Sequence, residues 1–126
     1  MKLDYECVRG ILLTVESLEH NQMLTNSNYA QFSLLKDYSY ETICYAVARL
    51  NEAGFFPKGN VIEVINGILM RIDALTWEGH QYLDCIRDEN IWKKAQKKVY
   101  GVGGAPLKIL GEVAMMFIRS SVGLSN

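Results

Sequence analysis

The sequence predicts an α+β fold, in which amphipathic helices accompany one short β-hairpin. Residues 3–19 place apolar side chains at steps of three and four, which is the period of a helix with one buried face. Two further apolar runs, 61–65 and 68–75, are the length of strands. Asn66 and Gly67 separate them, and this pair is typical of a tight hairpin turn. A chain of 126 residues is long enough to bury a core of this mixed kind.

The stretch between the first helix and residue 39 is less regular. Residues 20–28 are polar and predict a loop. Residues 29–34 partly alternate, so they predict either a short strand or a single helical turn near Leu34 and Leu35.

A second clear helix is predicted to begin at Ser39. Its buried line is formed by Ile43, Val47 and Leu50, which recur at helical spacing. Gly54 ends it, because glycine adopts the left-handed conformation of a helix C-terminus at little cost.

A third helix is predicted to follow the hairpin, with the Thr76 hydroxyl as its N-cap and Glu78 adding negative charge to its first turn. It is interrupted near residues 88–90 and resumes to about residue 100, and Pro106 starts a last helix. We therefore predict a domain over residues 1–100, a glycine-rich hinge over 101–104, and a C-terminal helix over 105–122.

Composition and motifs exclude several classes of function. No stretch is apolar for long enough to span a membrane, so we expect no membrane partner. The three cysteines, Cys7, Cys44 and Cys85, lie far apart in apolar helical patterns, which indicates reduced thiols in a cytoplasmic protein. His80 and Asp84 share a helix face, and we interpret them as an exposed pair rather than as ligands of a metal ion. We expect no metal, no cofactor and no enzymatic activity.

The order helix, short strand, recognition-type helix, hairpin and further helix resembles a winged helix-turn-helix domain with a two-stranded wing and additional C-terminal helices. More closely, residues 1–4, 50–54 and 75–88, together with Trp92, resemble a family of short uncharacterised proteins encoded by phages and prophages of bacteria. The resemblance covers about residues 1–122 and implies this fold and a phage-related setting, but no biochemical activity. The chain departs from the wider winged-helix pattern between Asn21 and Asp37, where a regular helix is hard to see.

If the helix predicted from Ser39 buries its apolar line, its opposite side can face a DNA duplex. An arginine there can donate hydrogen bonds to the edge of a guanine. The carboxylates of Glu41 and Glu52 lie nearby and would repel the phosphates, and the net charge of the chain is only −1, so contact with DNA would be local. The wing and the later basic run add cations. The predicted nucleic-acid-binding residues are Thr42, Tyr45, Arg49, Lys58, Arg71, Lys93, Lys94, Lys97 and Lys98.

The last helix is apolar around much of its circumference, so one small domain cannot cover all of it. We expect a homodimer, since a second copy is the economical partner. Its predicted interface residues are Leu107, Leu110, Val113, Phe117 and Ile118. The function expected from these features is that of a phage or prophage accessory protein that binds duplex DNA weakly as a dimer. The alternative is a protein-interaction module that binds or inhibits a host or phage protein without binding DNA.

Overall fold

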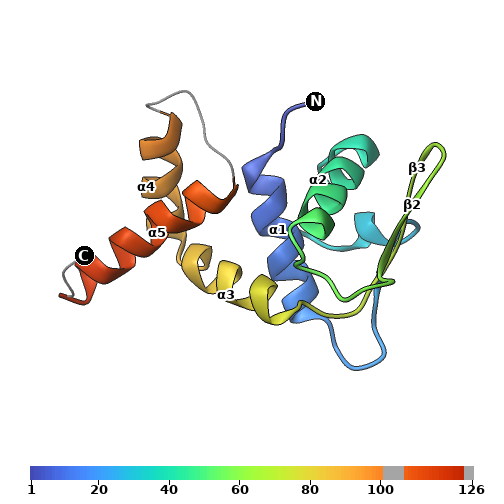
Figure 1. Cartoon of the computed structure of the whole chain (residues 1–126). Coiled ribbons are helices and arrows are strands. Elements are labelled where there is room, and N and C mark those ends of the chain that lie inside the picture. The colour runs from blue at the N-terminus through green and yellow to red at the C-terminus, as the bar shows by residue number, and fades with distance from the viewer. Residues whose placement is uncertain (101–106, 124–126) are drawn as a thin grey trace. The chain divides into compact units, whose positions relative to one another are not determined.

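The computed structural model describes residues 1–100 and 107–123 (Figure 1). In this part of the chain it contains five α-helices, one short 3-10 helix and a three-stranded antiparallel sheet, which confirms the α+β class. The chain divides into two compact units, Met1–His80 and Gln81–Asn126. This division falls before the hinge predicted at 101–104, and those residues lie outside the described part of the chain.

The helix α1 (Tyr5–Ser17) begins where Asp4 caps it. The Asp4 side chain accepts a hydrogen bond from the Cys7 backbone N–H at 3.0 Å, which satisfies one of the free donors of the first turn. The predicted helical face is confirmed, because its apolar side chains are buried. These are Cys7, Val8, Ile11, Leu12 and Val15.

The helix α2 (Tyr40–Glu52) packs against α1 and is capped by Ser39, as the sequence predicted. The predicted buried line of Ile43, Val47 and Leu50 is fully shielded from solvent. Gly54 follows the helix with a φ of 81°, the left-handed conformation that glycine adopts without strain.

The sheet consists of β1 (Leu24–Thr25), β2 (Val61–Val64) and β3 (Gly67–Ile72), with β3 in the middle. The predicted hairpin is confirmed, but its turn lies one residue earlier than Asn66 and Gly67. Val64 pairs with Gly67, so the two turn residues are Ile65 and Asn66. Gly67 begins β3 with a φ of 153°, a value that a side chain would make unfavourable.

The segment between α1 and α2 corrects two sequence predictions. The predicted loop at 20–28 contains β1, which is too short to produce a strand pattern. Residues 29–34 form no strand: Tyr29–Gln31 is a 3-10 helix, and turns follow it, so the helical-turn alternative was nearer. Asn28 supports β1 locally, because its side chain bonds the backbone N–H of Thr25 at 2.8 Å and the carbonyl oxygen of Met23 at 2.7 Å.

Asn26 joins β1 to β3 through its side-chain amide. Its Oδ1 accepts from the Met70 backbone N–H at 2.7 Å, and its Nδ2 donates to the Ile68 carbonyl oxygen at 2.9 Å. The same Nδ2 donates to the Tyr40 hydroxyl at 2.7 Å. The Asn26 side chain therefore joins the end of β1 to β3 of the hairpin and to Tyr40, the first residue of α2.

The helix α3 (Trp77–Ile86) begins at the predicted cap. Thr76 Oγ1 accepts from the Gly79 backbone N–H at 3.1 Å, while the Thr76 backbone N–H donates to the Phe55 carbonyl oxygen at 3.0 Å. A Cβ atom added at Gly79 would lie 2.6 Å from the Phe55 carbonyl oxygen. A glycine is therefore needed for this close approach.

The second unit contains α4 (Glu89–Tyr100) and α5 (Leu107–Ser121), which pack against each other. The predicted interruption at residues 88–90 is the start of α4, where Asp88 accepts from the Ile91 backbone N–H at 2.9 Å. The Tyr82 hydroxyl of α3 donates to the Leu107 carbonyl oxygen at 2.6 Å, and its ring lies against Gly111. These contacts fix the inward face of α5.

Candidate interaction surface

The outward face of α2 carries three of the side chains that the sequence predicted to bind nucleic acid. Thr42, Tyr45 and Arg49 are all partly exposed, at helical spacing on one side of α2. The Thr42 hydroxyl lies 2.9 Å from the Ser39 hydroxyl, where it takes part in the helix cap. The structure thus confirms the predicted orientation of α2 and leaves its ligand untested.

The Arg49 guanidinium is held within the helix surface. Its Nη2 donates to Glu52 Oε1 at 2.6 Å, and its Cζ lies 5.0 Å from the centre of the Tyr45 ring. The Tyr45 side chain, and to a lesser degree Glu52, raise the pKa of this guanidinium above its usual value. A guanine or a phosphate would have to compete with Glu52 for the Arg49 guanidinium.

The two predicted wing cations lie at the base of the hairpin. Lys58 is exposed in the turn before β2, and Arg71 is exposed on β3, where its backbone N–H donates to the Asn60 carbonyl oxygen at 2.8 Å. Their side chains are accessible, as the sequence predicted.

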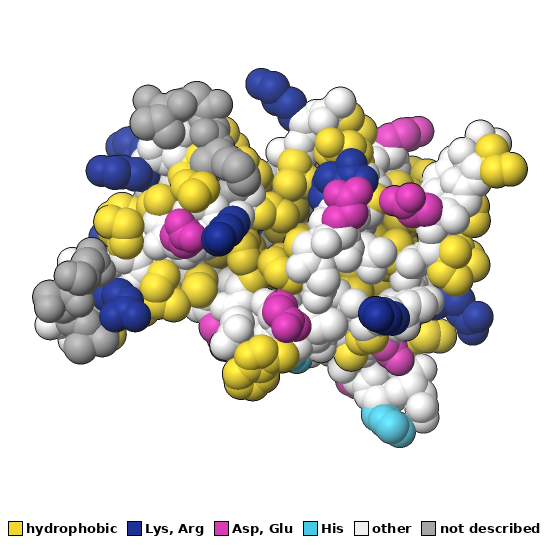
Figure 2. Space-filling view, in the orientation of Figure 1, with side chains coloured by type: hydrophobic (Ala, Val, Ile, Leu, Met, Phe, Trp, Pro, Cys, Tyr) yellow, Lys and Arg dark blue, Asp and Glu magenta, His cyan; other side chains and the backbone are white. Residues whose placement is uncertain are grey.

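The outer face of the hairpin is apolar, which the sequence analysis did not anticipate. Ile62 and Leu69 pair across the strands and are 49% and 46% exposed, and Val64 beside them is 52% exposed. Ile65 in the turn is 99% exposed, and Figure 2 shows hydrophobic side chains along the hairpin at the right of the view. The signal was present in β2, whose apolar residues do not alternate with polar ones as a strand with one wet face would require.

A groove of about 370 Å³ lies between α2 and the hairpin. Its lining is mostly apolar and includes Ala48 of α2 and Ile68 of β3, while Glu41 of α2 and Glu63 of β2 are its two acidic residues. No Lys or Arg side chain is among the described residues that form it. The remaining lining residues are Met1, Cys44, Tyr45, Val64 and Gly67.

The predicted lysines of the basic run all lie exposed on α4, in the second unit. Lys93 forms an ion pair with Glu89 at 3.5 Å. The buried residues of the same helix, Trp92, Ala95 and Val99, face the other way. The second unit has seven basic and four acidic side chains, a net charge of +3, whereas the first has six basic and ten acidic, a net charge of −4.

The predicted dimer residues of α5 divide into two groups. Leu110 is completely buried within the chain, so it belongs to the core and is not available to a second copy. Val113 and Phe117 are partly exposed and line a groove of about 240 Å³ with Lys98, Met116 and Ser120. Leu107 and Ile118 are also partly exposed.

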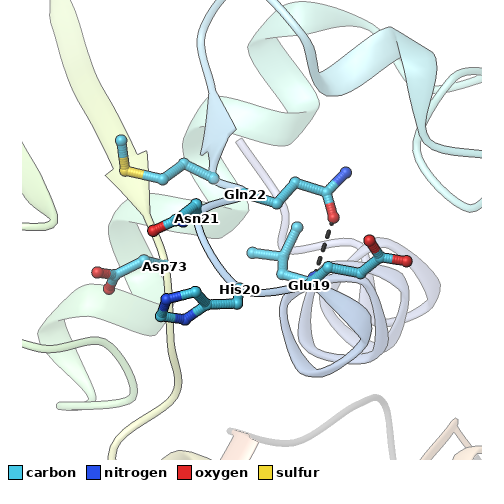
Figure 3. Close-up of a pocket in the computed structure, with 7 residues that line it drawn as sticks. Glu19, His20, Asn21, Gln22 and Asp73 are labelled. Carbon is cyan, nitrogen blue, oxygen red and sulfur yellow. Dashed lines mark hydrogen bonds between the residues drawn. The ribbon is translucent and has the colours of Figure 1, made fainter.

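A third hollow, of about 410 Å³, lies beside the loop that follows α1 (Figure 3). His20 and Asp73 both line it, and Gln22 Oε1 accepts from the Glu19 backbone N–H at 3.0 Å. No group of three or more His, Cys, Asp or Glu side chains suited to a metal ion occurs within residues 1–100 and 107–123. We assign no ligand to this hollow.

The thiols are free and shielded to different degrees. Cys7 is buried, and this burial, with the nearby Asp4 carboxylate, raises its pKa from 9.0 to about 12. Burial also raises the pKa of Cys44 and Cys85, which are partly exposed. Thiols with raised pKa values are poor nucleophiles at neutral pH.

Comparison with known proteins places the chain in a family. The family described as "Hypothetical protein (DUF2513)" matches residues 2–105, so this small α+β protein belongs to that family of hypothetical proteins. An uncharacterized protein of Haemophilus influenzae is 29% identical over 103 residues, which cover 79% of each chain. No solved structure matches the chain. None of the helices in the described residues has the length and apolar character needed to cross a membrane.

Proposed function

We propose that this chain is a winged-helix-like accessory protein that binds another protein through α2 and the β2–β3 hairpin. The order α1, β1, turn segment, α2, β2 and β3, with β1 beside β3, supports the winged-helix assignment. In that arrangement α2 is the recognition helix and the hairpin is the wing. The resemblance of residues 75–88 to phage and prophage proteins supports a phage-related setting.

The observation that carries the proposal is the chemistry of the recognition surface. Arg49 is the one cation of α2, and its guanidinium is paired with Glu52 and lies over the Tyr45 ring, so its positive charge is partly neutralised on this face. The outer face of the hairpin exposes the apolar side chains Ile62, Val64 and Leu69, and Arg71 is its one cation, so most of this face lacks the donors and positive charge that a DNA-binding wing needs. Exposed apolar surface rimmed by polar groups is characteristic of sites that bind proteins.

The test is capture of the partner by the whole tagged chain, cross-linked in the cells that encode it. Ile62→Asp places a charge on the apolar face and should abolish capture. Leu34→Asp is the matched control, because Leu34 is also 49% exposed but lies beside Gly10 of α1. Loss of partner capture with Ile62→Asp, together with normal capture by Leu34→Asp, would support the proposal. Equal capture by both variants, or by neither, would contradict it.

The second candidate is weak binding of duplex DNA by a dimer, and the exposed lysines of α4 favour it. Lys94, Lys97 and Lys98 share one helix surface, so they can neutralise neighbouring phosphates. Retention of genomic fragments at low salt, lost in the double variant Lys94→Ala and Lys97→Ala, would support this candidate over the first. Dimerisation through the outer face of α5 belongs to this proposal and is compatible with the first.

A further inference from the structure

We infer that the groove between α2 and the hairpin binds an extended segment of a protein partner, one that carries apolar side chains together with Lys or Arg. This inference rests on the proposed protein-binding function and specifies the chemistry of the partner. Three features of the first unit support it: a strand edge, an apolar lining and a pair of carboxylates.

The strand edge belongs to β2. Because β3 lies in the middle of the sheet, β2 pairs with β3 on one side and with no other strand of the described residues on the other. Val61–Val64 contains no proline or lysine, and its one charged residue, Glu63, lies on the face of the groove. An extended peptide can add to such an edge through main-chain hydrogen bonds.

The apolar lining defines what an added strand would carry. Side chains of a strand alternate between the two faces of a sheet. One set would lie on the same face as Glu63, which lines the groove with Ala48 and Ile68, and the other would continue the outer face beside Ile62. Both faces are apolar here, so the bound segment needs apolar side chains on both sides.

The carboxylates determine the charge of the segment. Glu41 and Glu63 line the groove without a Lys or Arg side chain among its described lining residues. A Lys or Arg of the partner would therefore find an acidic partner on α2 or on β2. A second copy of this chain is disfavoured, because a second β2 would bring another Glu63 and no Lys or Arg that could pair with Glu41 or Glu63.

The experiment presents the whole chain to a displayed library of random peptides. We expect enrichment of peptides that combine apolar residues with Lys or Arg. For a synthetic peptide of the enriched sequence, Glu41→Gln and Glu63→Gln should each weaken binding by about two- to five-fold, as expected for an exposed ion pair. Glu78→Gln is the matched control, because Glu78 is also exposed but does not line the groove. A strand added to β2 would bond it through every second backbone N–H of the peptide. Methylation of that set of nitrogens should therefore abolish binding, whereas methylation of the other set should not.

Several outcomes would overturn the inference. Enrichment of acidic peptides, no enrichment, or binding that is insensitive to both glutamine variants would do so. Self-association of the parent that Ile62→Asp abolishes would assign the surface to a second copy. A partner lost with Ile62→Asp but unaffected by Glu41→Gln and Glu63→Gln would refute the inference and leave the proposed function standing. Capture unaffected by Ile62→Asp would refute the proposed function itself.

Discussion

The Thr76 hydroxyl donates a hydrogen bond to the Gly54 carbonyl oxygen at 2.6 Å, which joins the end of α2 to the start of α3. The Thr76 Oγ1 also accepts a hydrogen bond from the Gly79 backbone N–H at 3.1 Å, so one side chain serves two helix ends. This junction explains why a threonine and a glycine stand three residues apart after β3. It also fixes the C-terminal end of α2 and thereby the face that α2 presents in the candidate surface.

Gly79→Ala should destabilise the protein by about 1–3 kcal/mol, the usual range for overpacking a close contact. The new Cβ would lie 2.6 Å from the Phe55 carbonyl oxygen and 3.3 Å from the Leu75 Cβ, so the junction must open. The free energy of unfolding in urea measures the effect. His80→Ala, at the exposed neighbouring position, is the control and should change it by less than about 0.5 kcal/mol. A Gly79→Ala variant as stable as the parent would contradict the close approach.

Asn26→Ala should cost about 1–3 kcal/mol, because it leaves backbone groups of β3 without their partner. The Met70 amide loses its acceptor, so its hydrogen exchange should accelerate. Urea unfolding and hydrogen exchange check the two effects together. Gln31→Ala, on the exposed surface of the same segment, should leave both unchanged. Unchanged protection of Met70 in Asn26→Ala would show that the side chain does not hold the hairpin.

The stability of the protein should fall at alkaline pH because of Cys7 and Tyr38. Burial raises the pKa of Cys7 from 9.0 to about 12, and burial followed by the Asp4 charge raises that of Tyr38 from 10.0 to about 12. Between these ordinary values and pH 12, both groups stay neutral in the folded protein, whereas they ionise in the unfolded chain. The stability that these two neutral groups contribute is therefore fully present below about pH 9, and it is lost as the pH rises toward 12.

Thermal unfolding between pH 7 and 11 measures this loss, and Cys7→Ala should reduce its slope. A thiol reagent at pH 8 gives an independent check, since native Cys7 should react far more slowly than in urea. Rapid labelling of native Cys7 would contradict its burial.

Phe117→Glu should convert a dimer into a monomer if the outer face of α5 joins two copies. Phe117 is partly exposed, so a charge there disrupts an interface without entering the core. Sedimentation equilibrium measures the mass, and circular dichroism verifies that the variant is folded. Lys108→Ala, exposed at the start of the same helix, is the control. A parent that remains monomeric at tens of micromolar would refute the dimer.

The sequence by itself determined the helices of this protein, because their signals are local. Apolar residues at helical spacing gave the buried line of α2, and the caps at Ser39 and Thr76 lie within three residues of the amides they bind. The hairpin was predictable for the same reason. Its register was not, because Val64 pairs with Gly67, whereas a turn at Asn66 and Gly67 would pair Ile65 with Ile68. The register depends on how both strands bury their inner faces.

Only the tertiary structure decided the remaining features. The strand β1 has two residues and exists because Asn26 bonds groups 42 and 44 positions away along the chain. The last helix is apolar on most sides, so periodicity could not assign Leu110 to the core and Phe117 to the surface. Packing of α5 against α4 and against the Tyr82 ring made that choice. The groove beside Glu41 and Glu63 likewise arises from α2 and the hairpin, whose side chains meet only in the folded chain.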